Sequence, residues 1–372
     1  MSAPILFSTI PTASGHVFGH ATLNSPATLN ALSLEMIDLL AAQLEAWAND
    51  EQVVGVLLDA AGDKAFCAGG DVVALYRSIR ETEPGRVPTL AAAFFEREYR
   101  LDHRIHSWPK PIVCWAHGIV MGGGIGLLAG ASHRVVTART KLAMPEIAIG
   151  LYPDVGGSWF LGRAPGRSGL FLALTGAPLN ASDAVFAGLA DFTLRHDDHG
   201  AMIEAIAAEA WIGRRDDDAA RLSHLLEAHA AGAEAPESPL RRHLDRIDTV
   251  IGHDRLADIA PRLLALADDA DAWLANAAAA FAKGAPSSAR LAIEMQRRAK
   301  RLSLADVFRL EYQASVGCCV HGDFAEDVRA LLVDKDKAPR WHPAARDEAD
   351  DALVSALLAP RFDGAHPLAD LR

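Results

Sequence analysis

Short, continuously apolar segments that alternate with amphipathic ones constrain the fold of this 372-residue chain more than any other feature. The segments "VVGVLLDA" (53–60), "PIVCWAHGIV" (111–120) and "HRVVTA" (133–138) have the length and the valine content of buried strands. Between the first two lies "VPTLAAAFFEREYRLDHRIHSW" (87–108), whose periodicity predicts a helix. Strands that alternate with helices predict an α/β core with helices packed outside the sheet.

The segment "SLEMIDLLAAQLEAWAND" (33–50) is expected to form an amphipathic helix capped by Ser33. Its predicted inward-facing residues are Met36, Leu39, Leu40, Leu44 and Trp47. The turn-rich segment "AGDKAFCAGGD" (61–71) is expected to be a loop.

The second half of the chain is predicted to be helical. Residues 200–285 are rich in alanine, and "LAIEMQRRAKRLSLADVFRLEYQASVGCCV" (291–320) reads as two helices with a break near Ser303. We therefore expect an α/β core over residues 1–200 and a helical C-terminal region over residues 201–372.

Composition limits the functional class. Thirty-six basic and 48 acidic residues give a formal net charge of −12, which argues against a nucleic acid or a membrane surface as the partner. The four cysteines lack metal-ligand spacing and are expected to be reduced thiols. Without a signal-peptide pattern or an apolar run of about 20 residues, the chain is expected to be a soluble cytoplasmic protein.

Two glycine clusters, "CAGGD" (67–71) and "MGGGIG" (121–126), are each expected just after a buried strand. Glycine allows positive φ and close approach to the bare backbone, so the N–H groups of such turns can stabilise developing negative charge. Two converging loops would form an oxyanion hole, whereas the alternative is a pair of tight turns that bind nothing. The second cluster also fits a dinucleotide-binding fingerprint, which is disfavoured because Glu146 follows Met-Pro instead of ending a strand.

Two carboxylates, Glu146 and Asp154, lie in the otherwise apolar segment "AMPEIAIGLYPDVGG" (143–157). Burial beside Met144 and Ile147 is expected to raise the pKa of Glu146 and to make it a better base near neutral pH. Asp154 precedes a predicted helix start, whose dipole is expected to favour the ionised form. The alternative for Asp154 is a simple helix cap.

Other polar features are given structural interpretations. The segment "RHDDHG" (195–200) lacks metal-ligand spacing and is expected to be a solvated loop. His117 is expected to be a hydrogen-bonded core histidine, and Cys318 and Cys319 are expected to pack on an apolar helix face. No G-x-S-x-G motif is present, which argues against a serine hydrolase of the α/β-hydrolase type.

In this order, "KAFCAGGD", "HGIVMGGGIGL" and "AMPEIAIGLYPDVGGSWFLGR" resemble the crotonase (enoyl-CoA hydratase/isomerase) superfamily. They are most similar to its 3-hydroxyisobutyryl-CoA hydrolase branch, as is the C-terminal "LEYQASVGCCVHGDFAEDVRALLVDKDKAPRW". The resemblance implies a crotonase-like spiral of ββα units with a helical C-terminal region. It also implies an acyl-CoA thioester as the substrate, and no cofactor, since coenzyme A is part of that substrate.

The resemblance also assigns site residues. The backbone N–H groups of Gly70 and Gly123 would hold the thioester oxygen. The Ala68 carbonyl would lie near the adenine and Lys64 near the phosphates of coenzyme A, where a mobile point charge suits phosphate. Glu98 matches a hydrolase-branch position at the substrate, and its alternative is a solvated position on a charged helix face.

One departure from the family pattern favours hydrolysis over hydration. Hydratases carry a glutamate in "GGGxE", where this chain has Gly126, while Asp154 replaces the glycine of the hydratase "PGxGG". We therefore expect an acyl-CoA thioester hydrolase acting on 3-hydroxyisobutyryl-CoA in valine breakdown, with Glu146 as base or nucleophile and Asp154 assisting. The alternatives are an enoyl-CoA hydratase or isomerase using Glu146 alone, and a non-catalytic acyl-CoA binding protein. Because crotonase relatives often form trimers, a homo-oligomer is possible.

Overall fold

The computed structural model describes residues 3–372, which divide into two compact units. The first contains the chain up to Gly70 together with Leu101–Leu142 and Leu179–Ser238. The second contains Asp71–Arg100, Ala143–Pro178 and Pro239–Arg372. The two units alternate along the chain, and the domain division near residue 200 stays a prediction.

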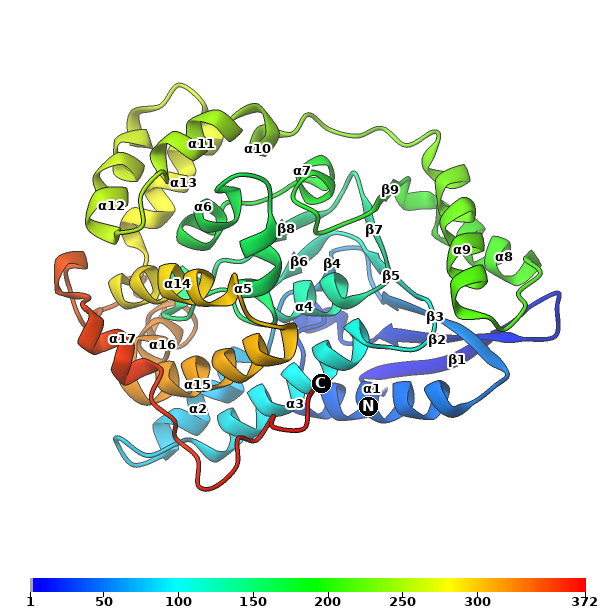
Figure 1. Ribbon diagram of the computed structural model, residues 1–372, viewed down its shortest axis with the longest axis horizontal. Coiled ribbons are helices and arrows are strands. Elements are labelled where there is room, and N and C mark those ends of the chain that lie inside the picture. The colour runs from blue at the N-terminus through cyan, green and yellow to red at the C-terminus, as the bar shows by residue number, and fades with distance from the viewer. Residues whose placement is uncertain (1–2) are drawn as a thin grey trace. The chain divides into compact units, whose positions relative to one another are not determined.

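A six-stranded sheet forms the centre of the first unit (Figure 1). Its strands, in spatial order, are β1 (Ile5–Pro11), β2 (Val17–Leu23), β3 (Val53–Ala60), β5 (Ile112–Ala116), β7 (His133–Thr137) and β9 (Phe192–Leu194). Only the β1–β2 pair is antiparallel, and each later pair is parallel. The predicted strands at 53–60 and 133–138 are β3 and β7. The single strand predicted at 111–120 is instead two strands, β5 and β6 (Ile119–Met121), which belong to different sheets and are separated at His117 and Gly118. The α/β class is confirmed.

Helices cover this sheet because its central strands are apolar on both faces. Seven of the eight residues of β3 are buried, and all five of β5 are. The helices of the first unit are α1 (Leu34–Asn49), α4 (Gly123–Gly130), α7 (Ala181–Phe186), α8 (His199–Ala208) and α9 (Arg215–Ala230), with the second part of α3 (Thr89–His106). Buried side chains of α8 and α9, such as Met202 and Leu222, pack with Phe18 and Trp115 in one core cluster.

Helix α1 begins as predicted, because the Ser33 Oγ accepts a hydrogen bond from the Met36 N–H at 3.2 Å. Its buried face differs from the prediction at one position. Leu39 is 37% exposed, and Ile37 is fully buried in its place. The inward stripe of the helix therefore includes Ile37 with Met36 and Leu40, at the i, i+1 and i+4 positions of a wide apolar face.

A second, three-stranded sheet consists of β4 (Ala65–Cys67), β6 (Ile119–Met121) and β8 (Lys141–Ala143). The expectation that residues 61–71 form a loop was therefore wrong for β4, because its three residues are buried and Ala65 and Cys67 pair with β6. The backbones approach closely here. At Gly118 (φ +61°) a Cβ atom would lie 2.3 Å from the Lys64 carbonyl oxygen, so only glycine fits.

The second unit is mostly helical, as expected for the C-terminal region. Its helices are α2 (Val72–Glu81), the first part of α3, α5 (Gly157–Phe160), α6 (Ser168–Thr175), α10 (Pro239–Arg242), α11 (Leu244–Val250), α12 (Leu256–Leu264), α13 (Ala272–Lys283), α14 (Pro286–Ala299), α15 (Leu304–His321), α16 (Asp323–Val328) and α17 (Asp351–Leu357). The predicted break near Ser303 is confirmed, since Ser303 caps α15 by accepting the Asp306 N–H. Within residues 3–372, no helix is both long enough and apolar enough to cross a membrane.

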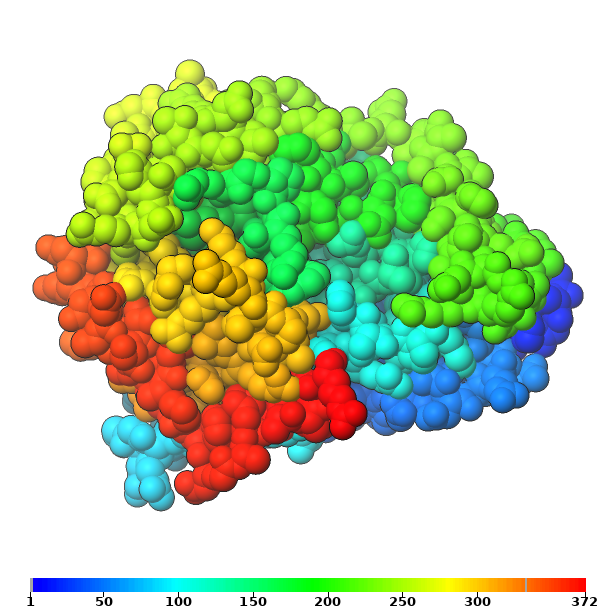
Figure 2. Space-filling model, viewed as in Figure 1, coloured from blue at the N-terminus to red at the C-terminus, as the bar shows by residue number. Residues whose placement is uncertain are grey.

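Two arginines of the second unit fix the last residues of the chain. Arg100 on α3 donates to the Asp370 carboxylate at 2.8 Å, and Arg309 on α15 donates to the Leu368 carbonyl oxygen at 3.0 Å. In Figure 2 this C-terminal segment, in red, lies against the orange surface of the preceding helices. The tail is thereby fastened to the helices that carry the buried acids described below.

The loop that leads to Gly70 is held by Asn30, which is fully buried and has φ +56°. The Asn30 Nδ2 donates to the carbonyl oxygens of Ala61 and Ala65, both at 3.0 Å, and its Oδ1 accepts the Ser25 N–H at 2.8 Å. Asparagine tolerates the left-handed conformation better than most residues. One side chain thus makes hydrogen bonds to three backbone groups of this loop, in Ser25, Ala61 and Ala65.

We predict that Asn30→Ala lowers the free energy of unfolding by about 2–4 kcal/mol, because it leaves buried backbone groups unpaired and places alanine at positive φ. Chemical denaturation measures this change. The matched control is Asn24→Ala, which removes an exposed hydrogen bond to the Ala3 carbonyl oxygen and should cost less than about 1 kcal/mol. Equal losses in the two variants would contradict the anchoring role.

Candidate active site

The two glycine clusters lie side by side in the first unit. Strand β4 runs parallel to β6, with Cys67 paired to Val120. A Cβ atom on Gly124 would lie 2.5 Å from the Cys67 carbonyl oxygen, so glycine is required for the two turns to meet. At Gly69 the backbone φ of +104° is what favours glycine, and a Cβ atom there would be in van der Waals contact with the Met121 carbonyl oxygen at 3.4 Å. The two glycine clusters are therefore adjacent, and their convergence on one oxygen stays a prediction.

Gly70 and Gly123 each present a backbone N–H at this junction. Gly123 is the first residue of α4, and the preceding Gly122 (φ +47°) provides no side-chain cap. In the described part of the chain, neither N–H donates a hydrogen bond to a protein oxygen. Unpaired N–H groups at a turn and at a helix N-terminus are suited to stabilise a developing oxyanion.

Lys64 and Ala68 flank β4 in the same loop. The Lys64 side chain is exposed, while its backbone carbonyl oxygen accepts the Ile119 N–H at 3.0 Å. The Ala68 N–H donates to the Leu29 carbonyl oxygen at 3.0 Å, which fixes the peptide unit beside Gly69. The coenzyme A contacts expected of these two residues stay predictions.

Three carboxyl groups predicted from the sequence lie in the second unit. Glu98 is on α3, Glu146 is the first residue of the 3-10 helix η2 (Glu146–Ile149), and Asp154 is in the turn before α5. They are 3%, 4% and 6% exposed, respectively. The alternative that Glu98 is a solvated helix residue is therefore wrong, because the charged face of "EREYRLDHR" does not include it.

Burial and mutual repulsion favour the protonated forms of these acids. Desolvation raises the pKa of Glu98 well above its usual value, and the charges of Asp154 and Glu146 raise it further. Desolvation and Asp154 also raise the pKa of Glu146, as predicted for a buried base. The Glu146 Oε2 has no hydrogen-bond partner among the described residues. Ionisation of one of these carboxyl groups therefore makes ionisation of its neighbours less favourable.

Asp154 behaves differently from its prediction. The first residue before α5 is Gly156, which makes no side-chain cap, so Asp154 is not the helix cap. Its Oδ2 instead accepts a hydrogen bond from the Tyr99 hydroxyl at 2.6 Å. Desolvation raises its pKa to about 6, although the Tyr99 hydrogen bond acts in the opposite direction. Burial of Asp154 therefore outweighs the ionising effect expected from the dipole of the following helix, which has only four residues.

The sequence interpretation missed four residues that surround Asp154. The hydroxyl groups of Tyr99 and Tyr152 lie 2.7 and 3.0 Å from the Ser315 Oγ. Glu311, one turn earlier on α15, is fully buried, and desolvation and the Asp154 charge raise its pKa to about 8. The available signals were local: Tyr99 follows Glu98, Tyr152 precedes Pro153-Asp154, and the other two lie in "LEYQAS".

The remaining polar features of the first unit are structural, with one correction. His117 is buried, and its Nε2 lies 2.7 Å from the Gly62 carbonyl oxygen, as expected for a core histidine. The segment 195–200 is not a solvated loop throughout, because the His199 Nε2 lies 2.9 Å from the buried Asp59 carboxylate. Burial opposes ionisation of Asp59, yet hydrogen bonds from His199 and His20 lower its pKa. Among the described residues no cluster suited to a metal ion is found.

The cysteines are buried, as predicted for packing residues and reduced thiols. In the described part of the chain none of the four forms a disulfide, and Cys318 and Cys319 are 5% and 3% exposed. Burial raises the pKa of both thiols, which disfavours the reactive thiolate.

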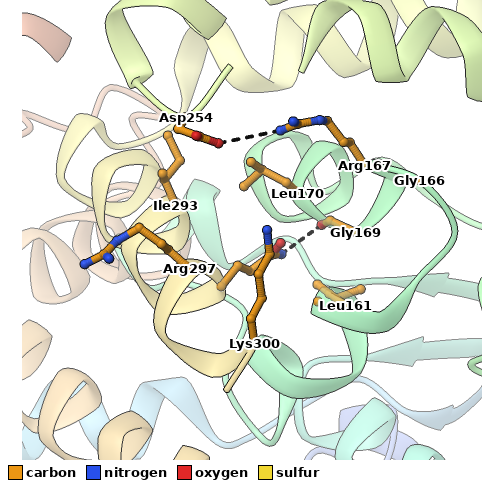
Figure 3. A pocket seen from close by; sticks show the side chains of 11 residues that line it. Leu161, Gly166, Arg167, Gly169, Leu170, Asp254, Ile293, Arg297 and Lys300 are labelled. Atoms are coloured by element: carbon orange, nitrogen blue, oxygen red, sulfur yellow. Dashed lines mark hydrogen bonds and ion pairs between the residues drawn. The ribbon is translucent and has the colours of Figure 1, made fainter. Parts of the chain in front are cut away.

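A surface pocket of about 80 Å³ lies elsewhere in the second unit, between α6 and α14 (Figure 3). Its cations are Arg167, Arg297 and Lys300. The Arg167 Nη1 lies 3.7 Å from the Asp254 carboxylate, and the Gln296 Nε2 donates to the Gly169 carbonyl oxygen at 3.0 Å. None of the site residues predicted from the sequence lines this pocket.

Comparison with known proteins gives the same family along most of the chain. A family model described as Enoyl-CoA hydratase/isomerase matches residues 18–358. A curated Gallus gallus protein named "3-hydroxyisobutyryl-CoA hydrolase, mitochondrial" is 37% identical over 346 residues, which cover 92% of this chain and 86% of that protein. The Homo sapiens protein of the same name is 36% identical over 329 residues, which cover 88% and 82%.

A solved structure is similar to this chain along almost its whole length. The protein titled a carnitinyl-CoA dehydratase from Mycobacterium thermoresistibile has a TM-score of 0.85 and 38% sequence identity, and the match covers 97% of this chain and 98% of that one. The paired glycine loops and the buried acids are thus part of a fold that extends over nearly the whole length of these relatives. This chain therefore belongs to the enoyl-CoA hydratase/isomerase family.

Proposed function

We propose that this protein hydrolyses the thioester bond of 3-hydroxyisobutyryl-CoA, a reaction of valine catabolism. The observation that carries the proposal is the acid set of the second unit: Glu98, Glu146 and Asp154 are buried together and influence one another's pKa. At the same time, Gly126 occupies the place of the first hydratase glutamate, the one in "GGGxE", while Glu146 matches the second. The names of the curated Gallus gallus and Homo sapiens relatives support the same activity.

Glu146 is the proposed base. Its carboxylate takes a proton from water as the water oxygen bonds to the thioester carbon, and the carbonyl oxygen becomes an oxyanion. That oxyanion would accept hydrogen bonds from the N–H groups of Gly70 and Gly123. Each of these hydrogen bonds would stabilise the transition state by about 2.7–4 kcal/mol. Collapse breaks the C–S bond, and the thiolate of coenzyme A takes up the proton, giving the free acid and the thiol.

Covalent catalysis by Glu146 is the second route to the same products. In this route a carboxylate oxygen of Glu146 attacks the thioester carbon and expels the thiolate, which leaves a mixed anhydride. Water then hydrolyses the anhydride and regenerates the carboxylate. Both routes are supported by the Glu146 Oε2, which has no hydrogen-bond partner among the described residues. Water or substrate would therefore displace no hydrogen-bonded protein group from this oxygen.

Asp154 and Glu98 are proposed to position the acyl group. Asp154 would accept a hydrogen bond from the substrate 3-hydroxyl or assist departure of the thiolate. Burial and two neighbouring acids raise the pKa of Glu98, which favours its protonated form, a hydrogen-bond donor. A neutral carboxylic acid beside an ionised one gives donor and acceptor roles to chemically similar side chains.

The proposal includes the expected binding partners and location. Lys64 would contact the phosphates of coenzyme A, and the Ala68 carbonyl would contact the adenine. The proposed reaction uses no cofactor besides the coenzyme A of its substrate, and a homo-oligomer in the cytoplasm is the proposed state. The relatives compared above are named as mitochondrial proteins, so cell fractionation is the experiment that decides the location.

An enoyl-CoA hydratase or dehydratase is the second candidate, because the solved structure with a TM-score of 0.85 is titled a carnitinyl-CoA dehydratase. Addition or removal of water at a C=C bond benefits from two carboxylates on the reacting water. The residue two positions beyond the triple glycine is Gly126, which has no carboxylate. Hydrolysis is therefore favoured over hydration.

We predict that the wild-type protein releases thiol from (S)-3-hydroxyisobutyryl-CoA and hydrates crotonyl-CoA negligibly. Loss of the base in Glu146→Gln should lower kcat by about 10²–10⁴-fold. Asp154→Asn, which keeps the volume and the Tyr99 contact, should lower kcat by about 10–100-fold. Release is followed with a thiol-reactive dye and hydration by loss of enoyl absorbance. Hydration without thiol release would return the protein to the hydratase class.

The raised pKa of Asp154 predicts a pH dependence of stability. The pKa of Asp154 is about 6 in the folded protein, whereas the ordinary value of 3.8 applies to the unfolded chain. The folded state therefore binds the proton more tightly. This contribution to stability is complete below about pH 4 and is lost as the pH rises through about 6. Asp154→Asn should therefore be more stable than wild type at pH 7.5, by up to about 3 kcal/mol, with the difference shrinking near pH 4. Urea denaturation at both pH values measures it, and a variant that is destabilised at pH 7.5 would contradict the assignment.

A further inference from the structure

The turn that carries Asp154 has an unfavourable backbone conformation. Val155 has φ +51° and Gly156 has φ +84°, so two successive residues are left-handed. A β-branched residue at positive φ is a genuine outlier, and Val155 is also only 3% exposed. The local hydrogen bond in this turn, from the Gly157 N–H to the Asp154 carbonyl oxygen at 2.6 Å, leaves the N–H groups of Gly156 and Ser158 to find other partners.

Both N–H groups donate to one distant carboxyl group. The Glu311 Oε2 accepts the Gly156 N–H at 2.8 Å, and its Oε1 accepts the Ser158 N–H at 3.0 Å. Glu311 comes from α15, more than 150 residues later, and is fully buried. The side chain therefore acts in place of the cap that α5 lacks, with both of its oxygens committed to the backbone.

Ser315 connects the same helix face to the Asp154 carboxylate. It lies one turn after Glu311, and its Oγ is 2.7 Å from the Tyr99 hydroxyl that donates to Asp154. The Tyr152 hydroxyl donates to the Glu311 carbonyl oxygen at 2.8 Å and lies 3.0 Å from the same Oγ. Helix α15 thus fixes the backbone on one side of Asp154 and the hydrogen-bond donor of its carboxylate on the other.

We propose that Glu311 is a positioning residue, which holds the left-handed turn 154–158 and thereby sets the place of the Asp154 carboxylate. It acts through Asp154 and does not contact substrate. The proposal rests on the function proposed above, in which Asp154 orients the acyl group or assists the leaving thiolate. Glu311 has no ion pair among the described residues, so these two backbone hydrogen bonds define its contribution.

The test begins with Glu311→Gln, which keeps the size of the side chain and replaces one oxygen by a donor. One of the two N–H groups then faces another N–H, so the turn loses its fixed conformation. We expect kcat for thiol release to fall by about tenfold or more, with KM changed by less than about threefold. The amides of Gly156 and Ser158 should exchange with deuterium faster than in the wild type.

The matched control is Glu294→Gln on α14. Glu294 is 6% exposed, and its carboxylate accepts hydrogen bonds from Arg297 and Arg298, at 2.9 Å from the Arg297 Nε and 2.7 Å from the Arg298 Nε. This variant should lose stability and keep the wild-type kcat, because Glu294 does not contact the turn. Assays are run well below the melting temperature of each variant, so that the folded fraction is equal.

A double-mutant cycle with Val155→Gly separates positioning from general stability. Glycine adopts positive φ without strain, so a turn that contains it depends less on Glu311. We expect Glu311→Gln to lower kcat by less than about threefold in the Val155→Gly background. Additive effects in the cycle would overturn the proposal, as would a kcat loss in Glu294→Gln equal to that in Glu311→Gln.

Failure of the proposed function can be distinguished from failure of the positioning role of Glu311. If the wild type releases no thiol from the 3-hydroxyacyl thioester, the function proposal fails, and the exchange rates of the Gly156 and Ser158 amides then decide the role of Glu311. Faster exchange in Glu311→Gln, and not in Glu294→Gln, supports the positioning role. Unchanged exchange at both amides overturns it.

Discussion

In the second unit Asp154 and three neighbouring carboxyl groups are buried, and the structure must compensate the cost of removing them from water. Glu98, Glu146, Asp154 and Glu311 are each less than 10% exposed, and no ion pair to Arg, Lys or His is found for them within residues 3–372. Burying an uncompensated charge is costly, so each group is either protonated or bound by dipoles. Asp154 receives the Tyr99 hydroxyl and Glu311 receives two backbone N–H groups, while Glu146 keeps one oxygen unpaired. Asp154 and Glu311 are thus held in place by hydrogen bonds, whereas the Glu146 Oε2 has no partner among the described residues, as the proposed base requires.

The first unit provides a complementary chemistry, because its junction consists of backbone donors instead of acids. Glycine is required at Gly118 and Gly124 by contacts of 2.3 and 2.5 Å from a hypothetical Cβ to the carbonyl oxygens of Lys64 and Cys67. These close approaches align β4 with β6 and leave the N–H groups of Gly70 and Gly123 without protein acceptors in the described part of the chain. Preorganised donors of this kind stabilise an oxyanion without reorganisation during the reaction.

The chemistry that a family member performs depends on a few positions within a shared scaffold. The curated relatives are named hydrolases, whereas a solved structure at similar identity is titled a dehydratase. Overall similarity therefore establishes the family but leaves the reaction to local residues. We propose that in this chain Gly126 and Asp154 are those residues, since by the family resemblance one removes a carboxylate and the other adds one. In the positioning proposal, a buried acid in a turn that contains a left-handed valine receives further support from Glu311 and Ser315 of α15.

The sequence by itself determined the family, the α/β class, the buried strands and the two acids of "AMPEIAIGLYPDVGG", because apolar periodicity and compact motifs are local properties. It also predicted the direction of the Glu146 pKa, which follows from its apolar neighbours. It did not predict that Asp154 has a raised pKa or is bound by Tyr99, and it assigned no role to Glu311. Those features depend on contacts between residues 55 to 155 positions apart. Only the tertiary structure brings α3 and α15 against the Asp154 turn, and desolvation there exceeds the local helix dipole.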